Sequence, residues 1–310
     1  MLFCAHMDTV EPARGVKPVI ENGIIRSSGD TVLGSDDKAG VVVILHLARM
    51  IHAQPDLPRP DLEFLFNVCE EVGLLGAKAL DTSDLKSVVG FVLDDHDPRG
   101  VTIKSPSAVR IDYKVIGRAS HAGVEPEKGI NALKVAADAI SKMRLGRIDF
   151  ETTANIGAIH GGKMSNIVLE TVEMKAEARS HNPEKLKEQS KHMHTCFEDA
   201  CIAWRKPGEE LPRVEIQEKD EYTAVQLSES DYPVRLALTA GKRLDWMMET
   251  KISGGGTDGS IIHSKGIPTA VLGVGMQEVH STKEYLRISD LEDAAKLVAA
   301  IVLTHAEGRI

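Results

Sequence analysis

The sequence predicts an α/β protein that is interrupted by a separate α+β unit, and three observations support this fold class. Short apolar runs that end in acidic residues or histidine alternate with stretches of helical periodicity, as in α/β sheets. Residues 107–223 follow a different order of strand, helix, strand, strand, helix and strand. The chain has 310 residues, which is long for one hydrophobic core and suits two domains.

These observations give the expected division of the chain. Residues 1–106 and 224–310 would form the two parts of one larger α/β domain. Residues 107–223 would form an inserted α+β (ferredoxin-like) domain between them.

Composition and charge exclude several classes of protein. Hydrophobic residues make up 42% and charged residues 27% of the chain, an ordinary globular composition. The net charge of −9, without a basic stripe, argues against a general nucleic-acid binder. No apolar run approaches the length of a membrane span, and the first residues lack the pattern of a signal peptide. The four cysteines form no Cys-x-x-Cys pair, so we expect free thiols in the cytoplasm.

Three apolar stretches of the first part end in potential metal ligands. Residues 1–5, 62–68 and 88–93 each predict a strand. The side chains that follow them are His6 and Asp8, then Glu70 and Glu71, and then Asp94. Because the carboxyl ends of parallel strands open onto one crevice, we expect these side chains to converge.

A hairpin and a helix are predicted between the first two of these strands. Residues 16–27 contain Asn22-Gly23, a hairpin signal. Residues 34–40 lead directly into a helix, whose expected buried stripe is Val41, Ile44, Leu45, Ala48 and Ile51. Asp36 and Asp37 therefore lie at a helix amino terminus, where capping is the ordinary role of an acidic residue.

The inserted domain and the last part of the chain contain further regular elements. In the inserted domain, strands are expected at 108–116, 152–158, 167–177 and 212–222, and helices at 129–143 and from Asn182-Pro183 onward. The last part should contain a helix at 233–241, a glycine-rich loop at 254–259 that opens a short helix, and a strand at 268–274. Ser289 and Glu292 predict a capping box for the final helix.

Two imidazoles and three carboxylates stand at these strand ends and helix starts. They are His6, Asp36, Glu71, Asp94 and His280. Nitrogen and oxygen ligands of this kind suit zinc, with cobalt or manganese as substitutes. Five ligands are too many for one tetrahedral ion, but they suit two ions if one carboxylate bridges them. Glu70 lies beside a ligand and is free itself, which makes it the natural general base.

Taken together and in order, these motifs make the chain resemble the dinuclear-zinc exopeptidases and deacylases. This family includes peptidase T, carboxypeptidase G, aminoacylase and succinyl-diaminopimelate desuccinylase. The matching stretches are residues 6–10, 34–40, 70–73, 93–94, 120–123 and 280–284. The form of residues 36–40, with Gly161-Gly162, Asn166 and residues 177–181, is most similar to the peptidase T-like branch. The resemblance implies a zinc-exopeptidase-type catalytic domain with a helix-flanked mixed sheet, and an inserted lid or dimerisation domain.

The resemblance also implies a role for each matching residue. His6 and Asp94 would hold one zinc ion, Glu71 and His280 the other, and Asp36 would bridge them. The peptide bond after the bridging residue is often cis in the family. Asp8 would orient His6, and Glu70 would pass a proton from the attacking water to the leaving amine. His121, Asn166, Arg179 and Gly255 would contact the substrate; in dimeric relatives the histidine that matches His121 reaches the partner's active site.

We therefore expect a zinc aminopeptidase of the tripeptidase type that acts on short peptides. Two alternatives stay open: an amidohydrolase that deacylates N-acyl amino acids, and a truncated metal-binding dimer without activity. Family members carry several dozen residues before the strand at 1–5, so we expect the N-terminal part of the catalytic domain to be missing. The expected partners are a short peptide and a second copy bound through the inserted domain, with no nucleic acid and no membrane.

Overall fold

The computed structural model describes residues 1–308, and the chain divides into two compact units. Unit 1 contains Met1–Ser105 and Val225–Ile310, and unit 2 contains Pro106–Ala224. Within residues 1–308, no helix has both the length and the apolar character that a membrane span requires.

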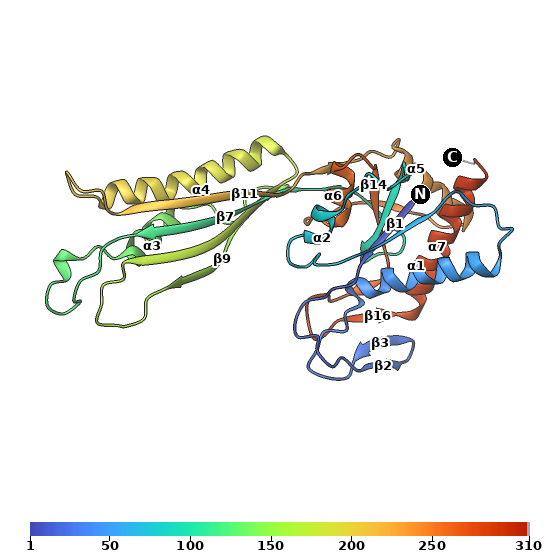
Figure 1. Cartoon of the computed structure of the whole chain (residues 1–310), viewed down its shortest axis with the longest axis horizontal. Helices are drawn as coiled ribbons and strands as arrows, with labels where there is room; N and C mark the ends of the chain where they lie inside the picture. Colours follow the sequence, from blue (N-terminus) through green and yellow to red (C-terminus); the bar gives the residue numbers. More distant parts are fainter. Residues whose placement is uncertain (309–310) are drawn as a thin grey trace. The chain divides into compact units, whose positions relative to one another are not determined.

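A seven-stranded mixed sheet forms the centre of unit 1 (Figure 1). Its strands are β1 (Leu2–His6), β4 (Glu63–Asn67), β5 (Gly90–Asp95), β6 (Gly100–Ser105), β12 (Val225–Gln226), β13 (Glu249–Ile252) and β14 (Thr269–Gly273). The order is β12-β6-β14-β5-β1-β4, with β13 paired to β6. Strands β4, β1, β5 and β14 are parallel, whereas β6 is antiparallel to β14. The parallel pairing of β1, β4 and β5 confirms that their carboxyl ends lie at one end of the sheet.

Helices cover both faces of this sheet. They are α1 (Ser35–Ala53), α2 (Leu75–Ala79), α5 (Tyr232–Arg243), α6 (Asp258–Ser264) and α7 (Ile288–Ala306). The side chains of β1 alternate between the faces, as the period of a strand requires. Phe3 and Ala5 belong to the core that also contains residues of α1, α5 and α7, while Leu2 and Cys4 pack in a smaller core with Ile262 of α6. Figure 1 shows α1 and α7 side by side.

A small antiparallel sheet in unit 1 holds the segment that carries His280. Its strands are β2 (Pro18–Glu21), β3 (Ile24–Ser27), β15 (Met276–Gln277) and β16 (Tyr285–Arg287), in the order β15-β16-β3-β2. Asn22 and Gly23, both with positive φ, join β2 to β3, which confirms the predicted hairpin. His280 lies between β15 and β16, and its backbone is left-handed, with φ of 60°.

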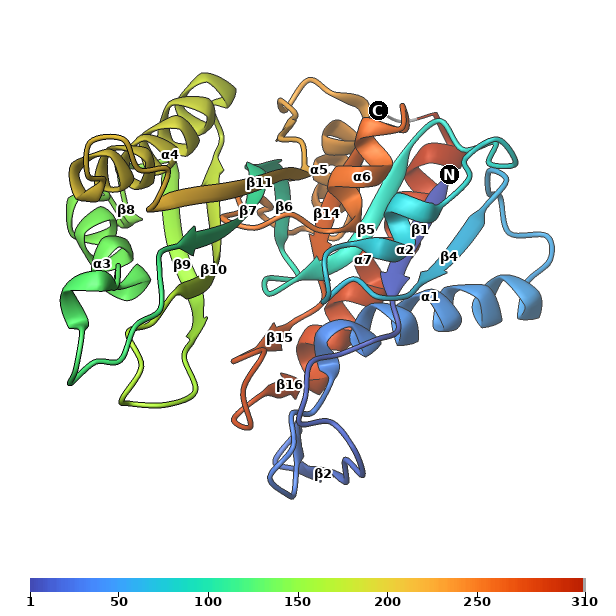
Figure 2. The same ribbon diagram turned by 60° about the vertical axis from the view of Figure 1, so that its left-hand side comes forward.

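Unit 2 is a five-stranded antiparallel sheet with two long helices (Figure 2). Its elements are β7 (Ser107–Ile116), a 3-10 turn (Pro126–Lys128), α3 (Ala132–Lys142), β8 (Gly146–Arg147), β9 (Thr152–Gly161), β10 (Thr171–Ser180), α4 (Pro183–Trp204) and β11 (Arg213–Tyr222). The strand order is β11-β7-β10-β9-β8. Alternate residues of β7, from Val109 to Val115, pack in the core with α3 and α4. The Asn182 side chain accepts bonds from the amides of Glu184 and Lys185, which confirms it as the cap of α4.

Three details of the fold differ from the sequence prediction. The final helix begins at Ile288, one residue before Ser289, and has no side-chain cap, so the predicted capping box is wrong. In α1 the side chain of Leu45 is 53% exposed, whereas Val43 and Leu47 are buried. Ile44 is buried, and Val41 and Ile51 pack against the core, so the predicted stripe is wrong at Leu45. The apolar run from Val41 to Leu45 suits several faces of a helix. Strand β6 was not predicted at all.

Candidate active site

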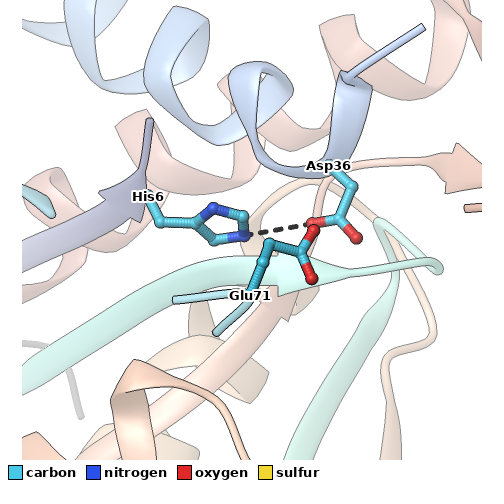
Figure 3. A group of neighbouring side chains, drawn as sticks. All are labelled: His6, Asp36 and Glu71. Atoms are coloured by element: carbon cyan, nitrogen blue, oxygen red, sulfur yellow. Dashed lines mark hydrogen bonds and ion pairs between the residues drawn. The ribbon is translucent and has the colours of Figure 1, made fainter. Parts of the chain in front are cut away.

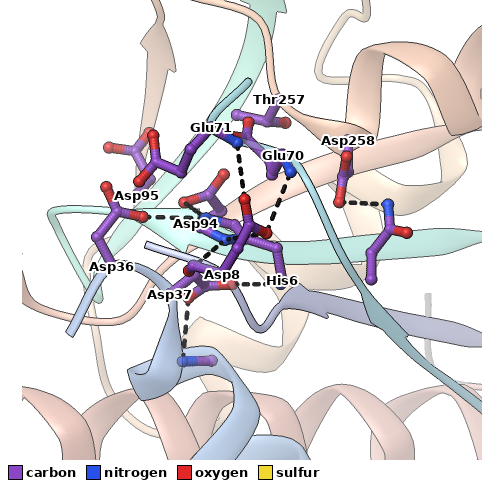
Figure 4. Close-up of polar contacts among 12 residues, drawn as sticks. His6, Asp8, Asp36, Asp37, Glu70, Glu71, Asp94, Asp95, Thr257 and Asp258 are labelled. Carbon is purple, nitrogen blue, oxygen red and sulfur yellow. Dashed lines mark hydrogen bonds and ion pairs between the residues drawn. The ribbon is translucent and has the colours of Figure 1, made fainter. Parts of the chain in front are cut away.

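All five predicted metal ligands meet at the carboxyl end of the parallel strands of unit 1. His6 ends β1, Glu71 follows β4, Asp94 lies near the end of β5, Asp36 lies at the start of α1, and His280 lies between β15 and β16. Figure 3 shows His6, Asp36 and Glu71 turned toward one another, and Figure 4 adds the neighbouring acidic side chains. The convergence expected from the strand ends is therefore present within one unit.

Asp36 lies between the two histidines. Its Oδ1 is 3.1 Å from Nε2 of His6, and its Oδ2 is 3.1 Å from Nε2 of His280. Each histidine also has a carboxylate of its own: Nε2 of His6 is 3.9 Å from Oδ1 of Asp94, and Nε2 of His280 is 3.0 Å from Oε2 of Glu71. The arrangement is thus two imidazole–carboxylate pairs that share one further carboxylate. The peptide bond between Asp36 and Asp37 is cis, as the resemblance implies.

The chemistry of this donor set fits divalent metal ions. One group of donor atoms, from His6, Asp36 and Glu71, lies within 4.8 Å of one another, and a second group comes from His6, Asp37 and Asp94. Oε1 of Glu71 is buried and has no hydrogen-bond partner within residues 1–308. Buried carboxylates at this density are costly unless a positive charge compensates them, and imidazole with carboxylate is a ligand set typical of zinc.

The pKa values of the cluster show the same excess of negative charge. Burial, with Asp258 and Glu71 nearby, raises the pKa of Glu70 to about 8, although His6 opposes the change. Burial and the neighbouring Asp37 also raise the pKa of Asp94 well above its ordinary value. Burial would lower the pKa of His6, but the hydrogen bond with Asp36 and the surrounding carboxylates raise it to about 10. The cluster therefore favours bound positive charge.

Asp8 connects the end of β1 to the turn after β4. Its Oδ1 accepts a hydrogen bond from the amide of Glu70 at 3.1 Å, and its Oδ2 accepts one from the amide of Glu71 at 3.2 Å. Oδ1 of Asp8 is also 3.4 Å from Nδ1 of His6, and the backbone carbonyl of Asp8 is 3.1 Å from the same nitrogen. Asp8 can thus orient the His6 ring and the two glutamates together.

Asp37 connects the start of α1 back to β1. Its Oδ2 accepts from the amide of His6 at 3.2 Å, and its Oδ1 accepts from the amide of Gly40 at 3.1 Å. A Cβ atom at Gly40 would lie 2.5 Å from the carbonyl oxygen of Leu93 and 2.6 Å from Oδ1 of Asp37. Only glycine therefore allows the helix to approach both β5 and this carboxylate. Asp37 therefore accepts a backbone amide in the first turns of α1 and also holds the strand that carries His6.

Sequence reasoning missed a second polar pair beside the turn of Glu70 and Glu71. Asn67 ends β4, and its Nδ2 donates a hydrogen bond of 2.7 Å to Oδ2 of Asp258 at the start of α6 (Figure 4). Asp258 is 1% exposed, and its other oxygen, Oδ1, has no hydrogen-bond partner among the residues that the structure describes. Burial raises the pKa of Asp258 to about 6, against the effect of the Asn67 bond. In the sequence, the position of Asp258 in the glycine-rich loop was the one indication that this residue could belong to the site.

The predicted substrate contacts are divided between the two units. His121, Asn166 and Arg179 are in unit 2, and Gly255 is in the loop between β13 and α6 of unit 1. Asn166 accepts the amide of Ala122 with its carbonyl, and the Arg179 guanidinium lies 3.0 Å from the Glu177 carboxylate. The Gly255 amide donates to the Ser253 hydroxyl at 3.1 Å. Three of these four residues belong to the other unit, and the roles of all four stay predictions.

The geometry of unit 1 defines a candidate site for divalent metal ions, and the comparisons with known proteins give the family. Residues 2–304 match the model of peptidase family M20/M25/M40, so the chain belongs to this family, whose members are metal-dependent. It is 40% identical over 301 residues to the uncharacterized protein YqjE of Bacillus subtilis, covering 97% of this chain and 79% of that one. It is 26% identical to peptidase T of Fusobacterium nucleatum, covering 96% of this chain and 71% of that one.

Solved structures of peptidases are also similar to this chain. A tripeptidase from Staphylococcus aureus has a TM-score of 0.91 and 39% identity, covering 99% of this chain and 80% of that one. The aminopeptidase PepT of Bacillus cereus has a TM-score of 0.85 and 38% identity, covering 97% and 79%. The resemblance to the peptidase T-like branch is confirmed. The comparisons do not confirm the expectation that the N-terminal part of the catalytic domain is missing.

Proposed function

We propose that this chain is a zinc-dependent aminopeptidase of the tripeptidase type, which removes the N-terminal residue from short peptides. The observation that carries the proposal is Asp36, whose two oxygens face the two histidines of one buried cluster. The family establishes a peptidase, and the tripeptidase and aminopeptidase among its similar structures support the type of substrate.

The donor pairs suggest which residues would hold each ion. His6 and Asp94 would hold one zinc ion, Glu71 and His280 the other, and Asp36 would be shared. Bound zinc supplies a Lewis acid for the peptide carbonyl and lowers the pKa of a water molecule to about 7.

Glu70 is the proposed general base. It lies next to the ligand Glu71, and its own carboxylate is not needed for the paired contacts with the histidines. In this role it takes a proton from the attacking water and passes it to the amine that leaves. Asp8 holds the amide of Glu70 and therefore fixes the direction from which the carboxylate approaches.

The remaining predicted residues would recognise the substrate. Arg179 is suited to a bidentate contact with a peptide carboxylate, and the Gly255 amide could donate to the same group. Asn166 would also contact the substrate, and His121 would polarise the scissile carbonyl in the active site of a second copy. We further propose that unit 2 serves as lid and dimerisation domain, and that the enzyme works in the cytoplasm, where the free thiols of its four cysteines would stay reduced.

One tripeptide in two forms tests the proposal. Zinc-loaded protein is incubated with the free and the N-acetylated peptide, and the products are measured by liquid chromatography. We expect cleavage of the free form only, and loss of cleavage when a chelator is added. Cleavage of the acetylated form would instead favour a deacylase, and no cleavage of either form by metal-loaded protein would contradict the proposal.

A further inference from the structure

Glu284 is buried next to the cluster but was not among the predicted ligands. It follows His280 by four positions, and its side chain is 2% exposed. Its Oε2 accepts a hydrogen bond of 2.7 Å from the amide of Gly34. Its Oε1 accepts one of 2.6 Å from the hydroxyl of Ser35 and one of 3.1 Å from the amide of Asp36.

These three bonds explain how a carboxylate can be buried here. An unpaired carboxylate in this environment would be costly, and hydrogen bonds to both oxygens offset the cost. Every donor comes from the segment Gly34–Asp36 at the start of α1. Glu284 therefore directs both oxygens to this backbone segment and not to the histidines.

The contact joins two parts of the chain that are 248 positions apart and that each carry a proposed ligand. Glu284 lies in the segment between β15 and β16 that carries His280, and its partner segment carries Asp36. His280 is 53% exposed, so few packing contacts fix it from outside. The distance of 3.1 Å between His280 and Asp36 depends on how these two segments are held.

We propose that Glu284 is a positioning residue of the metal centre, which holds the start of α1 against the His280 segment so that Asp36 faces both histidines. The proposal rests on the proposed metal site. It extends a pattern in which three of the ligand-bearing segments are each held by a carboxylate from another segment: Asp37 binds the amide of His6, Asp8 binds those of Glu70 and Glu71, and Glu284 binds that of Asp36.

The test compares Glu284→Gln with a matched variant, Glu63→Gln. Glu63 also accepts from two amides and a serine hydroxyl, those of Lys86 and Ser87. It is paired with Leu2 at the opposite end of β1 from His6, away from the ligands. A glutamine at position 284 would turn a donor toward Gly34 or toward Ser35 and Asp36, so at least one bond is lost. The Glu63→Gln variant measures the general cost of such a loss.

Binding of Co²⁺ to the full chain is the measurement, read by titration and by the visible spectrum of the bound ion. We expect Glu284→Gln to bind Co²⁺ about 10- to 100-fold more weakly, as for other residues that orient ligands, and to change the spectrum. Glu63→Gln should match the unmodified protein in both. Unchanged affinity and spectrum in Glu284→Gln, or an equal loss in both variants, would overturn the proposal.

Two further results distinguish a wrong metal site from a variant that fails to fold. If the unmodified protein binds no Co²⁺ or Zn²⁺, the proposed metal site itself is wrong, and the role of Glu284 is overturned with it. If Glu284→Gln does not fold, Ser35→Ala takes its place, with Ser87→Ala as the control, because each removes one hydroxyl donor from the corresponding glutamate. Weaker Co²⁺ binding in Ser35→Ala alone supports the proposal, and equal binding in both overturns it.

Discussion

Unit 1 and unit 2 both pack helices against a sheet, but they bury different kinds of polar side chain. The buried charged or titratable side chains of unit 1 include His6, Asp36, Asp37, Asp258 and Glu284. Among the described residues of unit 2, the buried polar side chains are Thr152, Ser180, Gln189 and Ser190, none of which is charged. Because buried charge opposes folding unless it is compensated, its concentration in unit 1 marks the functional site.

The direction of the strands explains why buried charge gathers in unit 1 and not in unit 2. In unit 1, β1, β4 and β5 run parallel, so the polar residues that follow them gather at one end of the sheet. In unit 2, neighbouring strands run in opposite directions, so the residues that follow them are divided between two ends. An antiparallel sheet of this kind builds a stable apolar core but does not collect charge at one place.

The largest expected effect comes from replacing the shared carboxylate. Asp36→Asn cannot present an acceptor to both His6 and His280, and it removes a charge from the cluster. We expect kcat/KM for a tripeptide to fall by at least about 1,000-fold, or about 4 kcal/mol of transition-state stabilisation. Asp112→Asn, on the outward face of β7 in unit 2, is the control and should keep nearly full activity. Comparable activity in the two variants would remove the basis for assigning the site to unit 1.

Metal removal should destabilise unit 1 and leave unit 2 unchanged. A chelator leaves the carboxylates of unit 1 without compensating charge, and metal present at 1,000 times its Kd contributes about 4 kcal/mol to the stability of the unit that binds it. Hydrogen exchange followed by mass spectrometry should become faster in residues 34–40 and 67–74. Exchange in α4 of unit 2 should not change. Equal acceleration in both units would show that the metal stabilises the whole chain and not one site.

A smaller effect is expected from crowding the contact between α1 and β5. Gly40→Ala would place a methyl group against the carbonyl oxygen of Leu93 and the carboxylate of Asp37, at a cost of about 1–3 kcal/mol. Gly157→Ala in unit 2 is the counterpart, because the nearest atom to its Cβ would be 3.6 Å away. Thermal unfolding and Co²⁺ titration of both variants check this. The same small loss of stability at both positions would contradict the close approach at Gly40.

The smallest expected effect is on the pH dependence of the unfolding free energy. It comes from surface carboxylates with lowered pKa values, which both units contain. Burial opposes ionisation of Glu63, but hydrogen bonds from Ser87 and Lys86 lower its pKa. A lowered pKa in the folded state gives stability above the unfolded pKa of about 4.3, which is lost as the pH falls through the folded value.

Glu63→Gln should therefore flatten the dependence of unfolding free energy on pH in that window, by less than about 1 kcal/mol. Asp149 of unit 2, whose pKa is lowered by a hydrogen bond from Lys185, should give the same direction of change in Asp149→Asn. Urea unfolding between pH 3 and 6 checks both variants. If the unmodified protein became more stable on acidification, and Glu63→Gln removed this gain, the pKa of Glu63 would be raised by folding and not lowered.

The elements with a regular pattern could be predicted from the sequence. Apolar runs located β1 and β5, and Asn22-Gly23 located the hairpin between β2 and β3. Strand β6 was missed because its alternation of Val101 and Ile103 with Thr102 and Lys104 is short and follows directly on the end of β5. The Thr102 hydroxyl donates to the Asp95 carboxylate, a partner on a neighbouring segment that no local pattern shows.

The residues of the candidate site likewise include some that the sequence predicts and some that it does not. The five proposed ligands stand in recognisable motifs, and the structure brings them together. Glu284, Asn67 and Asp258 were not predicted because each acts through a contact with a distant residue: Glu284 and Asp36 are 248 positions apart, and Asn67 and Asp258 are 191 apart. The sequence shows a residue type at such positions, but only the fold shows what it holds.

Glu70→Ala, with turnover and metal content measured on the same sample, tests the central claim most directly. In the proposed mechanism Glu70 transfers the proton, and His6, Asp36, Glu71, Asp94 and His280 bind the metal. We therefore predict that hydrolysis of a tripeptide is abolished while the bound zinc stays at the level of the unmodified protein. Undiminished hydrolysis by Glu70→Ala with zinc bound would contradict the account.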